Sequence, residues 1–302
     1  MNTAVIVCSR NRSDMAVRTL RRLGEQSLPS SEYEIILVDD ASDDDTLSKA
    51  RALESDIPNL RIVPCPSRVF QAQARNIGVN ATTANHLLFT DDDCIPTTDW
   101  VTRMEEALER EAIVAGAVDT PARPYFAVCH NVAEFHGFLP CQRAGEVDFI
   151  AGANMGIRRE VLARVGGFRQ DTPHAEDIEF VLRARQAGFR IWFLPEAAVM
   201  HNHNRTRFAD VIRYAGNHAE STILIRLRYS SLLSTPSLLR HPFTLILAAP
   251  FIAAKVTAGA FLRRTGMLRF WATIPVFYLT KIAWCMGAAT ALRRQRRGAP
   301  TA

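Results

Sequence analysis

Short apolar runs alternate with amphipathic stretches through the first two hundred residues of the chain. The runs are rich in Val, Ile and Leu, which is typical of strands that are buried on both faces of a sheet. In the stretches between them, apolar residues recur every three or four positions, as they do in helices that cover a sheet. This alternation predicts an α/β fold, with a mostly parallel sheet covered by helices. The five predicted strands are residues 3–7, 34–38, 60–63, 86–90 and 112–118.

The pattern weakens over residues 119–147, where three prolines and several aromatic residues break it. We expect a loop-rich insertion there, lying over the functional site. Two further strand-and-helix units follow, and glycines mark the ends of their helices. We therefore assign residues 1–205 to one domain and the arginine-rich residues 206–240 to a helical linker.

Residues 241–302 differ from the rest because they contain two long apolar segments. Residues 243–262 and 270–292 each carry one charge near the centre, Lys255 and Lys281. Either segment is long enough to cross about 30 Å of hydrocarbon as a helix. A lysine in mid-membrane costs about 2.5–3.5 kcal/mol on insertion scales. Because basic clusters also flank both segments, a hairpin in the membrane interface is favoured over two spans. A pair of buried soluble helices, for instance at an oligomer interface, stays open as an alternative.

Polar and acidic segments follow directly where three of the predicted strands end. "CSRNR" follows the first strand, "DDASDDDT" the second and "TDDDCIP" the fourth. Because ligands of such sheets bind beyond the carboxyl ends of the strands, we expect these segments to meet at one edge.

Three adjacent carboxylates at a strand end are costly unless a cation lies beside them. Side chains alternate along an extended segment, so Asp91 and Asp93 should face one way and Asp92 the other. Mg²⁺ and Mn²⁺ prefer oxygen ligands, and they often take few of them from protein. The sequence therefore favours a divalent metal site here, with a solvated acidic turn as the alternative.

Composition and charge narrow the function classes. The chain has 302 residues, of which 48% are hydrophobic and 22% charged, as in globular proteins. Its net charge of +5 gathers near the C-terminus, which favours an anionic partner. Lipid is the simpler partner, because the basic residues flank apolar segments and no aromatic nucleic-acid-binding motif appears. We therefore expect no nucleic acid.

The cysteines and the N-terminus point to the cytoplasm. Six cysteines occur without a C-x-x-C pair, so neither a zinc site nor a disulfide framework is expected. Free thiols in a reducing cytosol are the simpler interpretation. "MNTAVIVCSRNR" lacks the basic leader and long apolar stretch of a signal peptide.

Six stretches of the chain are informative as an ordered set. They are "VIVCSRNR", "ILVDDASDDDT", "QARNIGVNA", "LLFTDDDCIP", "GANMGIRREVLARVGGF" and "AEDIEFVLRARQAGFRI". In this order they resemble the motifs of family 2 glycosyltransferases of the Rossmann-like GT-A fold, of the membrane-associated bacterial type. The resemblance covers roughly residues 1–205, and the ordered set is far more specific than any one stretch.

The resemblance implies a metal-assisted, inverting sugar transfer, of the hexosyltransferase type, from a nucleotide-diphospho sugar to a hydroxyl acceptor. It implies Mn²⁺ or Mg²⁺ as the cofactor. It also implies a lipid-linked or cell-envelope saccharide as the acceptor, at the cytoplasmic face of the inner (plasma) membrane. By position, Asp177 would be the catalytic base and Asp93 a metal ligand, joined by His201 or His203.

The implied substrate-binding residues divide between the nucleotide and the acceptor. Asp40 would bind the nucleobase, Arg75 the nucleobase or diphosphate, and Asp91 the ribose. Arg10 stands where the family often has an aromatic residue, so nucleobase stacking does not carry over to this chain. The full set is Cys8, Arg10, Asp40, Arg75, Asp91, Asn154 and Glu176.

The residue types alone support the same chemistry. The leaving nucleoside diphosphate gains negative charge, which a divalent ion at Asp93 would neutralise. The acceptor hydroxyl must lose a proton, so a carboxylate has to stand near it. Asp177 follows Glu176 at the start of a predicted helix, and such neighbours raise the pKa of one of the pair. The alternative for this pair is an ordinary helix N-terminus, where acidic residues are common.

Two other functions stay open at this point. A non-catalytic nucleotide-sugar-binding protein or membrane assembly protein would need neither Asp93 nor Asp177. A sugar nucleotidyltransferase would call for a glycine-rich loop after the first strand, and "CSRNRSD" contains no glycine.

Overall fold

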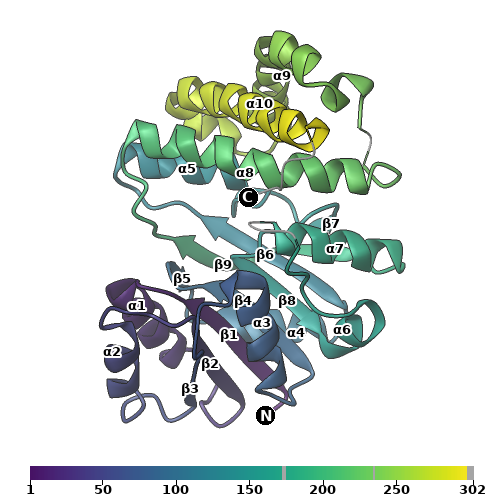
Figure 1. Cartoon of the computed structure of the whole chain (residues 1–302). Helices are drawn as coiled ribbons and strands as arrows, with labels where there is room; N and C mark the ends of the chain where they lie inside the picture. Colours follow the sequence, from purple (N-terminus) through teal and green to yellow (C-terminus); the bar gives the residue numbers. More distant parts are fainter. Residues whose placement is uncertain (172–174, 234, 298–302) are drawn as a thin grey trace.

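A sheet of nine strands forms the centre of the molecule, with helices packed on both of its faces (Figure 1). The computed structural model describes residues 1–171, 175–233 and 235–297. The strand order is β3-β2-β1-β4-β8-β6-β9-β5, and β7 pairs with β9. The strands are β1 (Thr3–Ser9), β2 (Tyr33–Asp39), β3 (Leu60–Pro64), β4 (His86–Asp91), β5 (Cys94–Pro96), β6 (Ile113–Asp119), β7 (Gly145–Val147), β8 (Asn154–Arg158) and β9 (Ile191–His201).

All five strands predicted from the apolar runs are present, as β1, β2, β3, β4 and β6. The sheet is parallel from β3 through β2 and β1 to β4, as predicted. Beyond β4 it is mixed, because β8 runs antiparallel to both of its neighbours while β6 and β9 are parallel.

Two apolar cores separate the sheet from its helices. Alternate residues of each strand face opposite sides, so Ile6 of β1 joins one core and Val7 the other. The helices α3 and α7 cover the first core, and α1 and α4 cover the second. The helices of the first two hundred residues are α1 (Ser13–Gly24), α2 (Thr46–Ala52), α3 (Phe70–Asn80), α4 (Trp100–Leu108), α5 (Tyr125–Phe135), α6 (Arg159–Val165) and α7 (Glu176–Gln186).

The prediction of a loop-rich insertion over residues 119–147 is wrong in one respect. An eleven-residue helix, α5, occupies the middle of this segment, and β7 lies near its end. Pro124 precedes the first residue of α5, and proline is well tolerated at the start of a helix. The prolines therefore mark the boundaries of a helix rather than its absence.

Three long helices follow the sheet. They are α8 (Phe208–Arg228), α9 (Pro242–Arg263) and α10 (Ile274–Arg296), with 3₁₀ turns η1 (Ser237–Arg240) and η2 (Met267–Thr273) between them. Residues 206–240 contain the helix α8, which packs against α5, α7 and α10. Figure 1 shows α5 and α8 between the sheet and the pair α9 and α10.

Two of the helical segments, Pro242–Arg263 and Met267–Arg296, are long and apolar enough to cross a membrane by length and composition. About a third of the first and two fifths of the second are buried within the molecule. Gly287 of α10 lies so close to the backbone of Gly216 in α8 that any larger residue there would overlap it. The close approach shows that α10 is packed tightly on α8.

Candidate active site

The carboxyl ends of β1, β2 and β4 meet at one edge of the sheet. The strand register pairs Ser9 with Asp39 and Cys8 with Asp91. The three polar segments that follow these strands are therefore neighbours in space, as the sequence predicted. This edge is where ligands bind in open α/β sheets.

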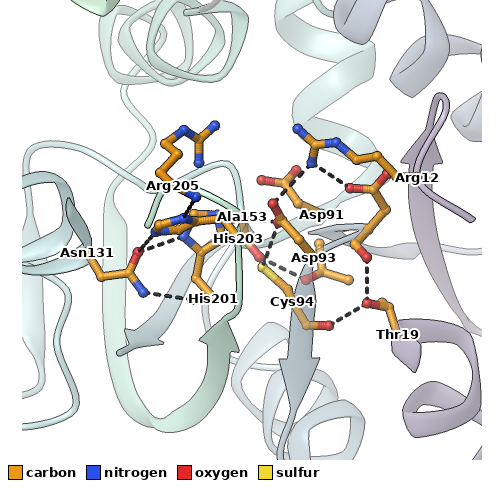
Figure 2. Close-up of polar contacts among 12 residues, drawn as sticks. Arg12, Thr19, Asp91, Asp93, Cys94, Asn131, Ala153, His201, His203 and Arg205 are labelled. Atoms are coloured by element: carbon orange, nitrogen blue, oxygen red, sulfur yellow. Dashed lines mark hydrogen bonds and ion pairs between the residues drawn. The ribbon is translucent and has the colours of Figure 1, made fainter. Parts of the chain in front are cut away.

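The acidic turn between β4 and β5 brings Asp91 and Asp93 together (Figure 2). Their carboxylate oxygens, the sulfur of Cys94 and a nitrogen of His201 all lie within 4.8 Å of one another. Asp92 accepts a hydrogen bond from Ser9 at 2.7 Å and pairs with Arg12 at 2.9 Å. The same Arg12 nitrogen also contacts Asp93 at 3.0 Å, and residues 92 and 93 form a turn, so the alternation expected of an extended segment holds only in part.

The far end of β9 brings His201 to the same turn. β5 pairs antiparallel with β9, which places His201 opposite Cys94. The His201 Nε2 atom lies 3.3 Å from Oδ1 of Asp93, while Arg12 pairs with the other oxygen of Asp93 at 3.0 Å. Residues from three distant parts of the chain therefore meet at Asp93.

Asn131, on α5, fixes the hydrogen position on the His201 ring (Figure 2). The side-chain amide of Asn131 donates to the backbone carbonyl of His201 at 2.8 Å, so its Oδ1 atom must accept. This oxygen lies 2.9 Å from Nδ1 of His201, which therefore carries a hydrogen in the neutral ring. The lone pair of Nε2 then points at Asp93, the arrangement that metal-binding histidines adopt.

The atoms that face one another here fit a divalent cation. A nitrogen lone pair and a carboxylate oxygen 3.3 Å apart repel each other unless a cation or a proton lies at this position. Arg12 contacts one oxygen of Asp93 at 3.0 Å, while the Nε2 atom of His201 faces the other. Burial raises the pKa of Cys94 and keeps its thiol protonated. Carboxylate oxygens and one imidazole nitrogen are therefore the donors, a set suited to Mn²⁺ or Mg²⁺.

The second histidine of "HNHN", His203, has both ring nitrogens engaged. Its Nε2 atom donates to Asn131 at 3.1 Å, and its Nδ1 atom accepts from the backbone N–H of Arg205 at 2.8 Å. Burial lowers the pKa of His203 to about 3, so the ring is neutral. His130 packs edge-on against it, with ring centres 4.4 Å apart. Of the two histidines considered from sequence, this geometry favours His201 as a ligand.

On the other side of Asp91, the buried Arg75 forms ion pairs with Asp91 and Glu176. Arg75 pairs with Glu176 at 2.9 Å and with Asp91 at 3.5 Å, and it donates to the carbonyl of Gly152 at 3.2 Å. Burial raises the pKa of Glu176, with Arg75 opposing the shift and Asp177 adding to it. Of the two neighbouring carboxyls, Glu176 is thus the one committed to Arg75.

Asp177 is partly exposed and is held by backbone groups. Its carboxylate accepts hydrogen bonds from the N–H groups of Gly152 and Ile178, each at 2.8 Å. A Cβ atom on Gly152 would overlap this carboxylate, so only glycine lets it approach so closely. These contacts orient a carboxylate beside Arg75 and leave part of it open to solvent.

The predicted nucleobase residues lie at the end of β2. Asp40 accepts from the backbone N–H groups of Val69 and Phe70, and Arg10 donates to the Asp40 carbonyl at 2.7 Å. Cys8 is buried, which raises the pKa of its thiol. The neighbouring Asp39 is not among the predicted binding residues. It has a buried Oδ1 atom with no hydrogen-bond partner in the described part of the chain.

Asn154 lies away from this group. It is fully buried, accepts a hydrogen bond from Trp100 at 2.9 Å, and donates to the carbonyls of Ala117 and Ala197. These bonds hold its side chain in the interior, where it joins β8 to β6 and β9, while a substrate-binding role for Asn154 stays a prediction.

Sequence reasoning missed Arg12 and Asn131. Arg12 falls within the quoted motif "CSRNR", and its position two residues after Arg10 was the available signal. Asn131 lies in the segment interpreted as loop, and no pattern in the sequence indicated that it would meet His201.

Comparison with known proteins agrees with this geometry. The family described as Glycosyl transferase family 2 matches residues 4–166, and Glycosyl transferase family group 2 matches residues 86–292. Glycosyltransferase AglE of Haloferax volcanii is 24% identical over 200 residues, which cover 66% of each chain. Succinoglycan biosynthesis protein ExoM of Rhizobium meliloti is 28% identical over 202 residues, or 64% of each chain. The match spans just under two thirds of the length of these relatives.

Solved structures share the fold over nearly the whole chain. A mannosyltransferase from Pyrobaculum calidifontis, in complex with GDP-Man and Mn²⁺, has a TM-score of 0.69 and 23% identity over 98% of this chain and 88% of that one. TarS of S. aureus, in complex with UDP-GlcNAc, has a TM-score of 0.56 and 16% identity over 99% and 93%. These likenesses establish the GT-A fold, and the family match covers more than half of the sequence. The chain belongs to glycosyltransferase family 2.

Proposed function

We propose that this protein transfers a sugar, with inversion, from a nucleotide-diphospho sugar to a hydroxyl group of a saccharide acceptor. The observation that carries the proposal is the meeting of two features at one sheet edge. One is the cluster of Asp91, Asp93 and His201, and the other is the oriented carboxylate of Asp177. A non-catalytic binding or assembly protein would need neither feature.

The donor would lie along the ends of β1, β2 and β4. The open Oδ1 atom of Asp39, beside Asp40, is suited to accept a nucleobase N–H, and Asp91 would face the ribose. Asp93 and His201 would hold a divalent ion, which would supply charge neutralisation for the leaving nucleoside diphosphate. Arg12, paired with Asp92 and Asp93 and 43% exposed, places a second positive charge beside the diphosphate.

Asp177 would act as the general base. Its carboxylate is anchored by two backbone N–H groups, and an anchored base removes a proton without first losing conformational freedom. The role requires the acceptor hydroxyl within hydrogen-bond reach of the carboxylate, on the face of the sugar away from the diphosphate. Arg75 and Glu176 would support this arrangement, because Arg75 contacts Glu176, Asp91 and the carbonyl of Gly152.

The acceptor is proposed to be a lipid-linked or cell-envelope saccharide, used at the cytoplasmic face of the plasma membrane. Relatives include a succinoglycan biosynthesis protein and O-antigen chain rhamnosyltransferases, and their names refer to the making of saccharide chains. Two apolar C-terminal helices suit an enzyme that works at a membrane.

A release assay tests this function. Purified protein in detergent with Mn²⁺ is offered UDP-, GDP- and dTDP-sugars, and free nucleoside diphosphate is measured for the wild type, Asp93→Ala and Asp177→Asn. We expect slow hydrolysis of one donor, which is lost in Asp93→Ala. If no donor turns over and no nucleotide binds with Mn²⁺, the glycosyltransferase function is wrong for this chain.

A further inference from the structure

One face of α9 and η2 leaves large apolar side chains in solvent. Phe243, Leu247 and Phe251 follow one another at intervals of four residues, which places them along one side of the helix. They are 60%, 61% and 78% exposed. With the exposed residues beyond them they form what we call the α9–η2 face. Its members are Phe243, Leu247, Phe251, Leu262, Leu268 and Trp271.

Residues 264–273 join α9 to α10, and we call them the junction. The junction is hydrogen-bonded to residues 1–205, the part of the chain that carries the candidate active site. Gln142 donates to the carbonyl of Thr265 at 2.8 Å, and the hydroxyl of Tyr125 donates to the carbonyl of Ala272 at 2.7 Å. Met267, in the same junction, is fully buried in a cluster with Leu139. If α9 and α10 were two membrane spans, this junction would lie on the opposite side of the membrane from the candidate active site, about 30 Å away across the hydrocarbon. The contacts therefore place both ends of α9 on the catalytic side.

The middle of α10 is also bound to the catalytic part. Lys281 is half-buried, donates to the carbonyl of Ala133 on α5 at 2.8 Å and lies over the ring of Phe277. This lysine was the residue that a membrane span could least accommodate. Its partner is a backbone group of α5 rather than lipid, so α10 serves as the support on which α9 lies.

The charge of this region is of one sign. Twelve lysines and arginines and no aspartate or glutamate follow Glu220 in the sequence. Lys255, Arg263, Arg264 and Arg269 are exposed on the same elements as the α9–η2 face. A second copy of this chain would bring the same positive charge against itself, whereas anionic lipid head groups complement it.

We infer that α9 and η2 lie flat in the interface of an anionic membrane, with the α9–η2 face inserted, and that neither α9 nor α10 crosses the bilayer. A helix of this kind buries its apolar side about 5–10 Å into the boundary between head groups and acyl chains. This inference gives the form of the membrane contact in the proposed function, but it rests on none of the sugar chemistry. The exposed arginines contact the head groups.

Vesicle flotation tests the surface. Full-length protein is mixed with vesicles of phosphatidylcholine alone or with 30% phosphatidylglycerol (a conventional anionic content, about one lipid in three), at low and high salt. We expect at least about tenfold stronger binding to the anionic vesicles at low salt, because exposed charges are screened as salt rises. The double variant Leu247→Glu/Phe251→Glu should lose that binding, while Trp192→Glu, at an exposed site on β9, should bind as the wild type does. Unchanged binding of the double variant, or its conversion from a dimer to a monomer with binding retained, would overturn the inference.

Labelling with a membrane-impermeant maleimide tests the topology. Cysteines are introduced as Ser237→Cys before α9 and Thr265→Cys after it, both at exposed positions. We expect both to be labelled from the side that carries the catalytic residues. Labelling of Thr265→Cys only from the opposite side would establish two spans and contradict the inference. Repeating both tests in Asp177→Asn protein separates them from the proposed function, since neither requires turnover.

Discussion

Two groups of ionisable side chains lie next to α5. In one group every charge has a partner within the protein, and in the other a carboxylate and an imidazole nitrogen face each other. Between α5, α8 and α10, Glu134 pairs with His218 at 3.1 Å and Lys281 donates to a backbone carbonyl. At the sheet edge, by contrast, Asp93 and the lone pair of His201 face each other. The first group is complete within the protein and holds helices together. The second would be completed by the divalent ion of the proposed function.

The proposed base offers the largest effect at the sheet edge. Asp177→Asn keeps an oxygen that can accept from Gly152 but cannot take a proton at neutral pH. We expect kcat to fall by about 10²–10⁴-fold, the usual contribution of a general base, with Mn²⁺ and nucleotide binding unchanged. Steady-state kinetics and calorimetry measure the two quantities. Asp148→Asn, at an exposed carboxylate paired with Arg185, is the control, and an equal loss in both variants would remove Asp177 from the base role.

Asn131 links the two groups, since it lies on α5 and orients His201. Asn131→Leu should weaken Mn²⁺ binding by about 10–100-fold, as expected when the partner that orients a metal ligand is lost. The matched control is Asn154→Leu, which also removes buried hydrogen bonds but away from the cluster. Both variants should lose about 1–3 kcal/mol of unfolding free energy. Equal Mn²⁺ affinity in the two variants would show that Asn131 does not position His201.

A substitution in the group between α5, α8 and α10 should lower the free energy of unfolding and leave Mn²⁺ binding unchanged. Glu134→Gln leaves His218 without its carboxylate partner. Breaking a fully buried pair costs about 3–5 kcal/mol. Because the Glu134 side chain is 18% exposed, we expect a smaller loss of about 1–3 kcal/mol. Thermal unfolding measures this loss, and Mn²⁺ titration should show no change. A loss of Mn²⁺ affinity without a loss of stability would contradict the structural role of Glu134.

The smallest effect is a pH dependence at His218. Burial alone would lower the pKa of His218, but Glu134 outweighs it and the pKa is raised above 6.5. The charged pair therefore stabilises the fold fully below pH 6.5, and the contribution is lost as the pH rises through the raised pKa. Melting temperatures of the wild type and His218→Gln should differ most near pH 6 and converge at higher pH. A difference that grows with pH would contradict the assigned charge.

The sequence predicts the parallel half of the sheet and the meeting of its strand ends, because both depend on local patterns. Apolar runs locate β1, β2 and β4, and the acidic motif after β4 brings Asp91 and Asp93 into one cluster. The contact between Asn131 and His201 joins residues seventy positions apart. Asn131 lies on α5, in the segment that its prolines led us to predict as loop. No local pattern carries such a contact. The same holds for Asn154, whose place in the interior depends on the neighbouring strands.

The C-terminal helices show the same limit. Length and composition identify two apolar segments but do not distinguish a span from a supported surface helix. The distinction depends on contacts of Thr265 and Lys281 with the distant residues Gln142 and Ala133.

Metal-dependent nucleotide binding tests the central claim most directly. Calorimetric titration of UDP, GDP and dTDP into the wild type and Asp93→Ala, with and without Mn²⁺, requires neither the sugar nor the acceptor to be known. We predict that one nucleotide binds to the wild type with Mn²⁺, and that its affinity falls at least about 100-fold without the ion or in Asp93→Ala. Equal binding with and without Mn²⁺, or undiminished binding by Asp93→Ala, would contradict a metal and diphosphate site at this sheet edge.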